Sequence, residues 1–413
     1  MQITAAFTLY VIIVSASHIG KPLACKNRWG CVMSTTSATA CGPQANSFEL
    51  QCQSPAQLQR ILHTDPYSAA GAFVRGEFSV AGDLVAAVRR QLGSGSQTMR
   101  TRLFNLAARV APWRLMQRCE QRLRTRRNIQ FHYDRSNAFY AIFLDRRMVY
   151  SCAYFPSTSS TLDDAQLAKL DHVCRKLRLH PGEQFLDIGC GWGALTVHAS
   201  RRFGVFSTGC TLSPHQAAYA RQAVDDALLH PFVRIVEQDY RDTPGSFDKI
   251  ASVGMVEHVG LARLRQYFRK VNCILRPDGL FLNHGITMPA SAHHDAQGLF
   301  IARYVFPGGE IVRLSDMITA AEKEGFAVLD VESLRAHYSM TCRAWLERLR
   351  SNETIALALV DEQTLRTWEI YLAGCVVAFE DGGLDIHQIL LGKQGRQNTP
   401  LTRNDIYAGC YSG

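Results

Sequence analysis

Phe185-Leu186-Asp187-Ile188-Gly189-Cys190-Gly191-Trp192-Gly193 is the stretch of this sequence from which the fold is best predicted. It predicts a short apolar strand, a glycine turn, and a helix that begins at about Ala194. Glycine has no Cβ, so the turn can adopt unusual backbone conformations and a ligand can lie against it. The helix that follows directs its unpaired N–H groups toward the same place. The stretch therefore predicts a ligand site at the end of a strand.

Two classes of nucleotide cofactor are bound by such a turn. The dinucleotide fingerprint G-x-G-x-x-G requires a third glycine where this chain has Ala194. The spacing found here, D-x-G-x-G-x-G, resembles instead the first motif of the S-adenosylmethionine (SAM) methyltransferases. The turn therefore favours SAM over NAD.

Length and composition are those of a globular protein with a basic surface. The 413 residues are 47% hydrophobic and 20% charged, enough for roughly two or three domains. The formal charge of +9 is spread along the chain, so it favours weak attraction to an anionic surface and does not indicate nucleic-acid binding. Thirteen cysteines without a C-x-x-C pair predict free thiols in a reducing compartment, with neither a disulfide framework nor a metal site.

The N-terminal part divides into three predicted pieces. Residues 1–45 form an apolar and then Ser- and Thr-rich leader, either disordered or an extension upstream of a start at Met33. Residues 46–98 form a small domain, with helices over 56–63 and 82–92 and a strand over 71–78. Residues 99–127 are rich in arginine. They are either a solvated linker helix or a basic surface for anionic lipid, where each cation contributes roughly 1 kcal/mol.

The pattern from residue 128 to residue 395 alternates between strands and helices. Strands separated by helices predict an α/β fold with a doubly wound, mostly parallel sheet, and a polar tail follows at 396–413. Strands are expected at 184–188, 206–211, 232–237, 247–253, 279–286 and 386–391. Helices are expected at 163–179, 194–203, 214–229, 260–275, 312–324, 341–351 and 361–380.

Ligands of such sheets bind beyond the carboxyl ends of the strands. The residues with useful chemistry fall at those ends, namely Asp187, Gly189, Gly191, Thr211, Asp239, Glu257 and His284. SAM needs a partner for its ribose hydroxyls, and the second strand ends without a carboxylate. Thr211, Ser213 or Gln216 must therefore serve the ribose, while Asp239 and Tyr240 can contact the adenine.

Several motifs, in order along the chain, resemble those of the cyclopropane-fatty-acyl-phospholipid synthases and the mycolic acid cyclopropane synthases. The resemblance covers about residues 128–393, with a weaker match over 65–95, where the family has a small N-terminal domain. Its motifs are His132-Tyr133-Asp134, Tyr150-Ser151-Cys152-Ala153-Tyr154-Phe155, the glycine stretch, Thr211-Leu212-Ser213 with Gln216, Val256-Glu257-His258-Val259-Gly260, His284-Gly285-Ile286, Phe306-Pro307-Gly308-Gly309 and His337-Tyr338.

The resemblance implies the class I SAM methyltransferase fold, which is Rossmann-like, with helical lid insertions. The implied cofactor-binding residues are Tyr150, Ser151, Asp187, Gly189, Gly191, Gly193, Thr211, Leu212, Ser213, Gln216, Asp239, Tyr240 and Arg241.

The resemblance also implies a reaction, the transfer of a methylene group from SAM to a cis double bond of an unsaturated phospholipid acyl chain. The alkene attacks the sulfonium methyl, and a base then removes a proton from the added methyl so that a cyclopropane ring closes. In the family this base is thought to be bound bicarbonate. The motifs place its holders at the Cys152 backbone, Glu257, His284, the Ile286 backbone and Tyr338. Cys375 matches a cysteine once proposed as the nucleophile, but no step needs a thiolate, so a structural role is favoured.

Departures from the family pattern leave the product open. Asn283 and Gly285 flank the histidine where the best-known members have Leu and Thr, and Glu380 stands where arginine is expected. The product could instead be a methyl-branched or methylene fatty acid, or the enzyme could methylate a soluble small molecule. The expected partners are unsaturated phospholipids and an anionic membrane, contacted peripherally from the cytoplasm at the inner face; a homodimer is left open.

Overall fold

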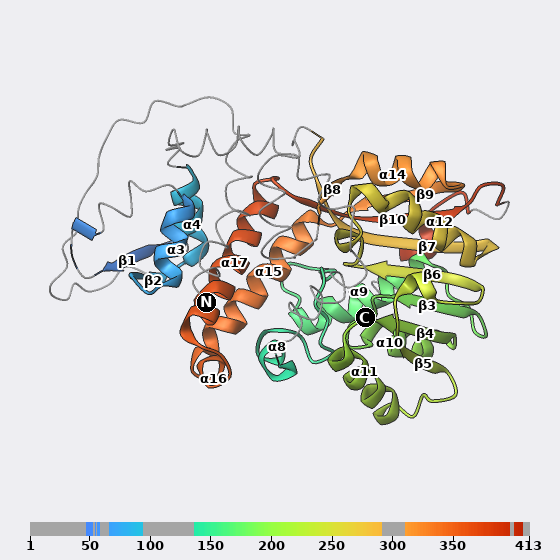
Figure 1. Ribbon diagram of the computed structural model, residues 1–413, viewed down its shortest axis with the longest axis horizontal. Helices are drawn as coiled ribbons and strands as arrows, with labels where there is room; N and C mark the ends of the chain where they lie inside the picture. The colour runs from blue at the N-terminus through green and yellow to red at the C-terminus, as the bar shows by residue number, and fades with distance from the viewer. Residues whose placement is uncertain are drawn as a thin grey trace.

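The computed structural model describes residues 47–52, 54, 56–57, 66–93, 136–290, 310–396 and 400–407. Its larger sheet has eight strands and lies in the right-hand half of the view in Figure 1. The strand order is β5-β4-β3-β6-β7-β10-β9, with β8 paired to β7. Strands β3 to β8 pair in parallel, and β10 is antiparallel to both β7 and β9. The strands are β3 (Gln184–Ile188), β4 (Phe206–Thr211), β5 (Val233–Glu237), β6 (Phe247–Val253), β7 (Leu275–Met288), β8 (Val312–Arg313), β9 (Phe326–Ser333) and β10 (Asp385–Lys393).

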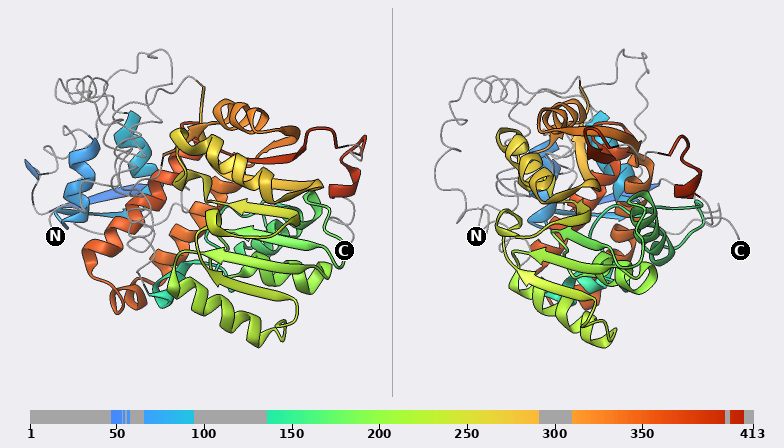
Figure 2. Two further views of the ribbon diagram at one scale, coloured as in Figure 1. Left: turned by 45° about the vertical axis from the view of Figure 1, so that its right-hand side comes forward. Right: turned by 90° about the vertical axis from the view of Figure 1, so that its right-hand side faces the viewer.

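Helices cover both faces of the sheet, because successive strand residues point to opposite sides. On β3, Phe185 packs with helices α9 and α10, whereas Leu186 and Ile188 pack with α12 and α14. Figure 2 shows these two layers on either side of the strands. The predicted doubly wound α/β fold is confirmed. The helices of the two layers are α9 (Leu162–Lys176), α10 (Ala194–Phe203), α11 (Pro214–Asp226), α12 (Leu264–Ile274) and α14 (Leu314–Lys323).

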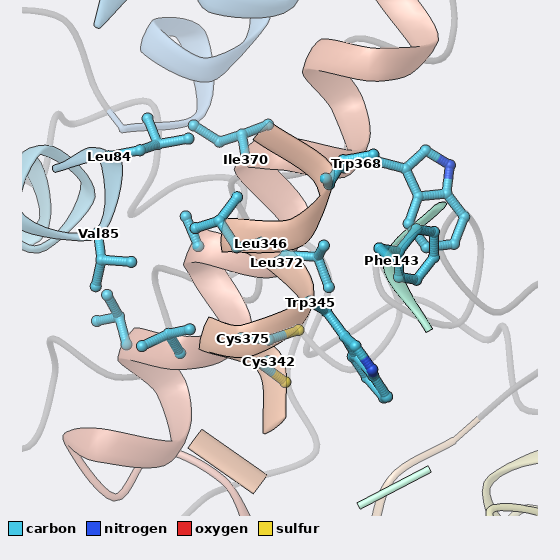
Figure 3. Close-up of a cluster of buried hydrophobic side chains, with 14 of the residues drawn as sticks. Leu84, Val85, Phe143, Cys342, Trp345, Leu346, Trp368, Ile370, Leu372 and Cys375 are labelled. Atoms are coloured by element: carbon cyan, nitrogen blue, oxygen red, sulfur yellow. The ribbon is translucent and has the colours of Figure 1, made fainter. Parts of the chain in front are cut away.

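A third group of elements packs beyond the sheet, around α15 (Arg335–Ser351) and α17 (Glu362–Glu380). Figure 3 shows that side chains of α15 and α17 meet Phe143 on one side and Leu84 and Val85 on the other. The N-terminal elements therefore share one hydrophobic core with these helices. The remaining elements are β1 (Phe48–Cys52), α3 (Pro66–Val74), β2 (Phe78–Gly82), α4 (Leu84–Gly93), α8 (Asn137–Phe143), α16 (Glu353–Leu357) and α18 (Asn404–Tyr407).

Most predicted elements of the sheet region are confirmed, and one prediction further upstream is wrong. The strand expected over 71–78 is instead the end of α3 followed by the start of β2. Ala69, Ala70, Phe73 and Val74 of that helix are buried against the core, so tertiary packing overrides the strand preference of the aromatic and branched residues. Strand β9 was not predicted, and α15 begins at Arg335, six residues before the expected start.

Several predictions fall outside the described residues. These are the leader 1–45, the linker 99–127, the motif at 132–134 and the motif at 306–309, and most of the helix expected over 56–63. The division of the chain into domains stays a prediction. Within the described ranges, no helix is long and apolar enough to cross a membrane.

Candidate functional site

The glycine turn lies between β3 and α10. Gly189, Gly191 and Gly193 have φ angles of 77°, 54° and 88°, a region that side chains disfavour. A Cβ on Gly193 would lie only 2.9 Å from the Cβ of Ala220 on α11, so this glycine also allows two helices to approach closely. A Cβ on Gly191 would have no atom within 4 Å, so the backbone there faces open space. The turn thus has the geometry expected of a surface for a ligand.

A pocket lies over this turn at the carboxyl ends of β3, β4, β5 and β6, and we call it the glycine-turn pocket. Of the residues that the resemblance assigned to the cofactor, Gly193 and Ser213 do not line it; Gly193 precedes α10 and Ser213 caps α11. Eleven others do line it: Tyr150, Ser151, Asp187, Gly189, Gly191, Thr211, Leu212, Gln216, Asp239, Tyr240 and Arg241.

The ribose candidates form a hydrogen-bonded group at the start of α11. Thr211 Oγ1 donates to Gln216 Oε1 at 2.9 Å and accepts from the Ser213 backbone N–H at 3.2 Å. Ser213 Oγ in turn accepts from the Gln216 backbone N–H at 3.3 Å. Because Gln216 Oε1 already accepts a hydrogen bond, its amide N–H groups remain as donors beside the pocket.

The adenine candidates lie at the end of β5. The Asp239 carboxylate accepts hydrogen bonds from the backbone N–H and from the guanidinium of Arg241, with which it forms an ion pair. Tyr240 follows directly, and burial raises the pKa of its phenol to about 12, so it stays neutral. The structure therefore places an acceptor carboxylate and an aromatic ring together at this end of the pocket.

Sequence reasoning missed several residues of the glycine-turn pocket. Lys169 on α9 is buried, and its Nζ donates to Ser151 Oγ at 3.0 Å. His258 follows the predicted Glu257 directly in the chain, and burial lowers the pKa of its imidazole to about 4. A buried polar position within an amphipathic helix was the available signal for Lys169. The other missed residues include Met148, Val149, Gln238, Met255, Arg263 and Gln266.

Glu257 and His284 are both buried, and His284 lies on β7 two residues before Ile286, whose backbone N–H bonds to Glu257; we call these two residues the Glu257–His284 pair. Glu257 Oε1 accepts from the Ile286 backbone N–H at 2.7 Å, but Glu257 Oε2 is buried without a hydrogen-bond partner among the described residues. His284 Nδ1 lies 3.1 Å from Gln388 Nε2 on β10, and its Nε2 is likewise buried and unpartnered in the described part of the chain. Two such atoms are costly unless a bound group satisfies them.

Burial sets the protonation of this pair. It raises the pKa of the Glu257 carboxyl to about 7, although the hydrogen bond from Ile286 opposes the shift. It lowers the pKa of His284 well below its ordinary value, and the nearby charges of Lys169 and Lys176 act in the same direction. The imidazole is therefore neutral. In the tautomer that accepts a hydrogen bond from the Gln388 amide at Nδ1, the ring proton is on Nε2, from which it can donate a hydrogen bond.

The remaining predicted residues, Cys152, Tyr338 and Cys375, lie in or against the hydrophobic core built around α15 and α17, which we call the lid side of the site. Cys152 is buried, and its thiol is directed to the backbone oxygens of Ala153 and Leu334. Tyr338 on α15 packs against Phe379, and burial raises the pKa of its phenol well above the ordinary value. Cys375 lies in the apolar interface between α17 and α15, beside Cys342 (Figure 3). No hydrogen bond within the described residues joins Tyr338 or Cys375 to the Glu257–His284 pair.

The departures from the family pattern have local structural explanations. A Cβ on Gly285 would lie 2.3 Å from Val256 Cγ1, so glycine allows the Val256–His258 turn to pack directly on β7. Asn283 Oδ1 accepts a hydrogen bond of 2.8 Å from the buried Tyr267 hydroxyl. Glu380 forms ion pairs with Arg89 of α4 and Arg343 of α15. Glu380 therefore attaches the N-terminal elements to the lid helices.

Comparison with known proteins agrees with this arrangement. The profile of the mycolic acid cyclopropane synthetase family matches residues 120–389. A probable fatty acid methyltransferase of Pseudomonas putida is 42% identical over 364 residues, which is 86% of this chain and 90% of that protein. The cyclopropane mycolic acid synthase MmaA2 of Mycobacterium tuberculosis is 35% identical over 64% of this chain and 96% of its own length.

Solved structures give the same result. The structure of MmaA2 from M. tuberculosis superposes with a TM-score of 0.62 and covers 65% of this chain and 98% of its own. The structure of the mycolic acid cyclopropane synthase CmaA1, complexed with SAH and CTAB, is 34% identical with a TM-score of 0.62, covering 65% of this chain and 98% of its own. The chain belongs to the mycolic acid cyclopropane synthetase family and is a SAM-dependent methyltransferase of that family.

Proposed function

We propose that this enzyme transfers a methylene group from SAM to a cis double bond of an unsaturated phospholipid acyl chain, giving a cyclopropane fatty acid. The observation that carries the proposal is the Glu257–His284 pair, in which a carboxyl oxygen and an imidazole nitrogen are buried without hydrogen-bond partners among the described residues. Met255 and His258, close to Glu257 in the chain, line the glycine-turn pocket. A methyl transfer to a neutral amine or to an already ionised oxygen does not have to remove a proton from carbon. A reaction that must remove a proton from a carbon needs a base held in this way.

The glycine-turn pocket fits SAM by the chemistry of its lining. Its floor is backbone without side chains at Gly189 and Gly191, and the donors of Gln216 and the acceptors of Asp239 lie at separate strand ends. When bound, SAM supplies an electrophilic methyl group on a sulfonium. The residues of the pocket hold that group in one orientation, which matters because an alkene is a weak nucleophile and must be kept in near-attack geometry.

The proposed reaction balances as follows. The π electrons of the alkene form a bond to the methyl carbon as its bond to sulfur breaks, and S-adenosylhomocysteine (SAH) leaves. The acyl chain then carries a cation at the other alkene carbon. Removal of one proton from the added methyl leaves the electron pair that closes the ring. Water would capture the cation as an alcohol, so burial of Glu257 and His284 protects the step.

Bicarbonate is the proposed base, and the free atoms of the pair fit it. Glu257 Oε2 can accept a hydrogen bond from the hydroxyl of bicarbonate, and His284 Nε2 can donate to one of its oxygens. The anion must be held by uncharged donors here, because His284 is neutral. The backbones of Cys152 and Ile286 and the hydroxyl of Tyr338 are the other proposed holders.

A methyl-branched fatty acid is a second candidate product, and the name of one relative favours it. The P. putida protein that is 42% identical to this chain is named a probable fatty acid methyltransferase. If the cation loses a proton from a neighbouring chain carbon instead, the product is a methyl-branched fatty acid. The methyl group is then retained whole, and a double bond remains.

The partner is proposed to be the inner face of an anionic membrane, contacted peripherally from the cytoplasm. The net charge of +9 supports this proposal. Vesicles of anionic phospholipid should co-sediment the protein at low salt and release it at high salt. Protein that stays in the supernatant at low salt would instead support a soluble substrate.

Lipid analysis of a strain that expresses the protein tests the reaction. Unsaturated acyl chains should gain the mass of one CH₂ group and lose their double bond, and a strain that expresses Glu257→Gln should not show the change. Unchanged lipids in the presence of folded protein that binds SAH would contradict the proposal.

A further inference from the structure

Helix α9 has an unusual buried face. Gln166, Lys169, His172 and Lys176 are spaced three, three and four residues apart, so they lie on one side of the helix, and all four are buried. A helix that packs on a sheet normally presents an apolar stripe on that side. Buried lysine is rare unless it is paired. This face therefore requires an explanation beyond packing.

Lys176 and His172 are explained by their partners on the sheet. Lys176 Nζ pairs with Asp330 at 3.2 Å and with Glu332, and His172 Nε2 lies 2.8 Å from the same Glu332 carboxylate. Lys169 has no such ion pair within 4 Å in the described residues, although it lines the glycine-turn pocket. Its closest polar contact is a hydroxyl, the Oγ of Ser151 at 3.0 Å.

Lys169 and Gln166 together hold one segment, Tyr150–Cys152. Gln166 Nε2 donates to the backbone oxygen of Ser151 at 2.9 Å, and Lys169 donates to the side chain of the same residue. Immediately after this segment, the Ala153 backbone N–H donates to Thr341 Oγ1 on α15 at 3.0 Å. The chain is therefore held between α9 on one side and α15 on the other.

This segment borders both parts of the site. Tyr150 and Ser151 line the glycine-turn pocket, and Cys152 is the next residue, whose backbone belongs to the proposed base site. A shift of the segment would therefore change both the binding of SAM and the position of the base. Directional hydrogen bonds fix the position of this segment more precisely than van der Waals contacts can.

The charge around Lys169 supports a role in the pocket. Burial lowers the pKa of its ammonium group to about 8, while the carboxylates of Asp145 and Asp187 favour the charged form. Conversely, burial raises the pKa of Asp187 to about 6, and the hydrogen bond from Thr196 and the charge of Lys169 both oppose this. Lys169 is thus a cation at neutral pH, so its hydrogen bond to Ser151 is charge-assisted.

We infer that Lys169 is a positioning residue, whose ammonium group holds Ser151 and thereby aligns the Tyr150–Cys152 segment with the bound cofactor. The inference rests on SAM as the cofactor and does not depend on the lipid substrate. SAH binding can therefore test it without any lipid, and failure of the proposed reaction would leave the result unaffected.

A double-mutant cycle in SAH affinity is the test, with Lys169→Met and Ser151→Ala measured by calorimetry. Each single variant should weaken SAH binding about tenfold, because a charge-assisted hydrogen bond is lost. The double variant should bind no more weakly than Lys169→Met alone, because both substitutions remove the same interaction. With saturating SAM, Lys169→Met should also reduce kcat, since the segment that borders the base is displaced.

Lys249→Met is the matched control. Lys249 is also buried, but its Nζ donates to the Arg178 backbone oxygen at 3.1 Å and it does not line the glycine-turn pocket. This variant should lose thermal stability and keep the SAH affinity of the unaltered protein. If Lys169→Met does not fold, Lys169→Ala, which also has no hydrogen-bond donor in its side chain, takes its place in the cycle.

Two results would overturn the inference. The first is strict additivity of the Lys169 and Ser151 substitutions, which would mean that the two side chains act independently. The second is full restoration of SAH binding to Lys169→Met by Asp187→Asn, which would mean that Lys169 only compensates the buried carboxylate.

Discussion

The glycine-turn pocket and the Glu257–His284 pair lie next to each other but are built differently. In the pocket, the polar side chains that point to a cofactor role are already hydrogen-bonded to one another, as Thr211 is to Gln216 and Asp239 is to Arg241. In the pair, one oxygen of Glu257 and one nitrogen of His284 are buried without partners among the described residues. Side chains of the first region are therefore held by one another before a ligand binds, whereas these two atoms of the second region have no hydrogen-bond partner in the part of the chain that the structure describes.

From this difference we infer separate roles for the two regions. A preorganised set of hydrogen bonds holds a cofactor in place, and it loses affinity gradually as single contacts are removed. An unsatisfied buried carboxylate and imidazole are retained at a cost in stability, which is typical of a functional site. We therefore expect substitutions in the pair to affect turnover, and substitutions in the pocket to affect cofactor affinity.

The largest effect is expected for Glu257→Gln. The amide keeps the shape of the side chain but cannot orient a base in the same way, so turnover should fall by about 10² to 10⁴. SAH affinity, measured by calorimetry, should remain within about twofold, because the glycine-turn pocket is unaltered. Loss of SAH binding in this variant would remove the distinction between the two regions.

The pH dependence of the free energy of unfolding tests whether the Glu257 carboxyl is buried without full compensation, as the comparison of the two regions requires. The pKa of the Glu257 carboxyl is raised in the folded protein from 4.5 to about 7. Its contribution to the free energy of unfolding is therefore fully present below pH 4.5 and is lost as the pH rises through 7, a change of roughly 3 kcal/mol. Urea denaturation from pH 5 to pH 8 should show this loss in the unaltered protein and not in Glu257→Gln. Parallel curves for the two proteins would contradict a raised pKa of the buried Glu257 carboxyl.

Gly285→Ala tests how closely the Val256–His258 turn packs on β7. The new Cβ would lie 2.3 Å from Val256 Cγ1, and such overpacking costs about 2 kcal/mol. Urea denaturation should show this loss, and turnover should fall as Glu257 is displaced. The same substitution should cost less in a Val256→Ala background; an equal cost in both backgrounds would mean that the contact with Val256 is not the cause.

Thr211→Val should lower the affinity for SAH without changing turnover. The substitution removes the hydroxyl that bonds to Gln216 and Ser213, a loss of about 1 kcal/mol, or roughly fivefold in SAH affinity. At saturating SAM the turnover should be unchanged. A reduced kcat with unaltered affinity would place Thr211 in the chemistry and would break the comparison.

The smallest effect is expected for Cys375→Ala. The thiol lies in the apolar interface between α15 and α17 (Figure 3), and no step of the proposed reaction needs a thiolate. Turnover should stay within about twofold, while stability falls by about 1 kcal/mol because a small cavity forms. A loss of turnover comparable to that of Glu257→Gln would make Cys375 part of the catalytic machinery.

The sheet and its cofactor pocket were predictable because each depends on local sequence. Period-two and helical spacing placed β3, α10, β4 and β6 to the residue, and the strand ends then collected Asp187, Thr211 and Asp239 in one place. The pocket also contains Lys169, whose polar side chain on an amphipathic helix was only an indirect signal. Its role depends on contacts with Ser151 and Asp187, which come from other elements.

The lid side was less predictable because its elements depend on long-range packing. Among the described strands, β9 pairs only with β10, more than fifty residues later in the chain, and its alternation is weak. Helix α3 contains strand-forming residues and is stabilised by burial against α17. The burial of Glu257 and His284 likewise depends on the packing of β7, β10 and the Val256–His258 turn against one another. Such long-range packing cannot be predicted from the local sequence.

The most direct measurement uses SAM with a fully deuterated methyl group, purified protein and vesicles of an unsaturated phospholipid. If the pair directs removal of a proton from the added methyl, the product will retain two of the three deuterium atoms and will have no double bond. Mass spectrometry with NMR of the product reads both properties. Retention of all three deuterium atoms together with a double bond would contradict methylene transfer and would identify the enzyme as a lipid C-methyltransferase.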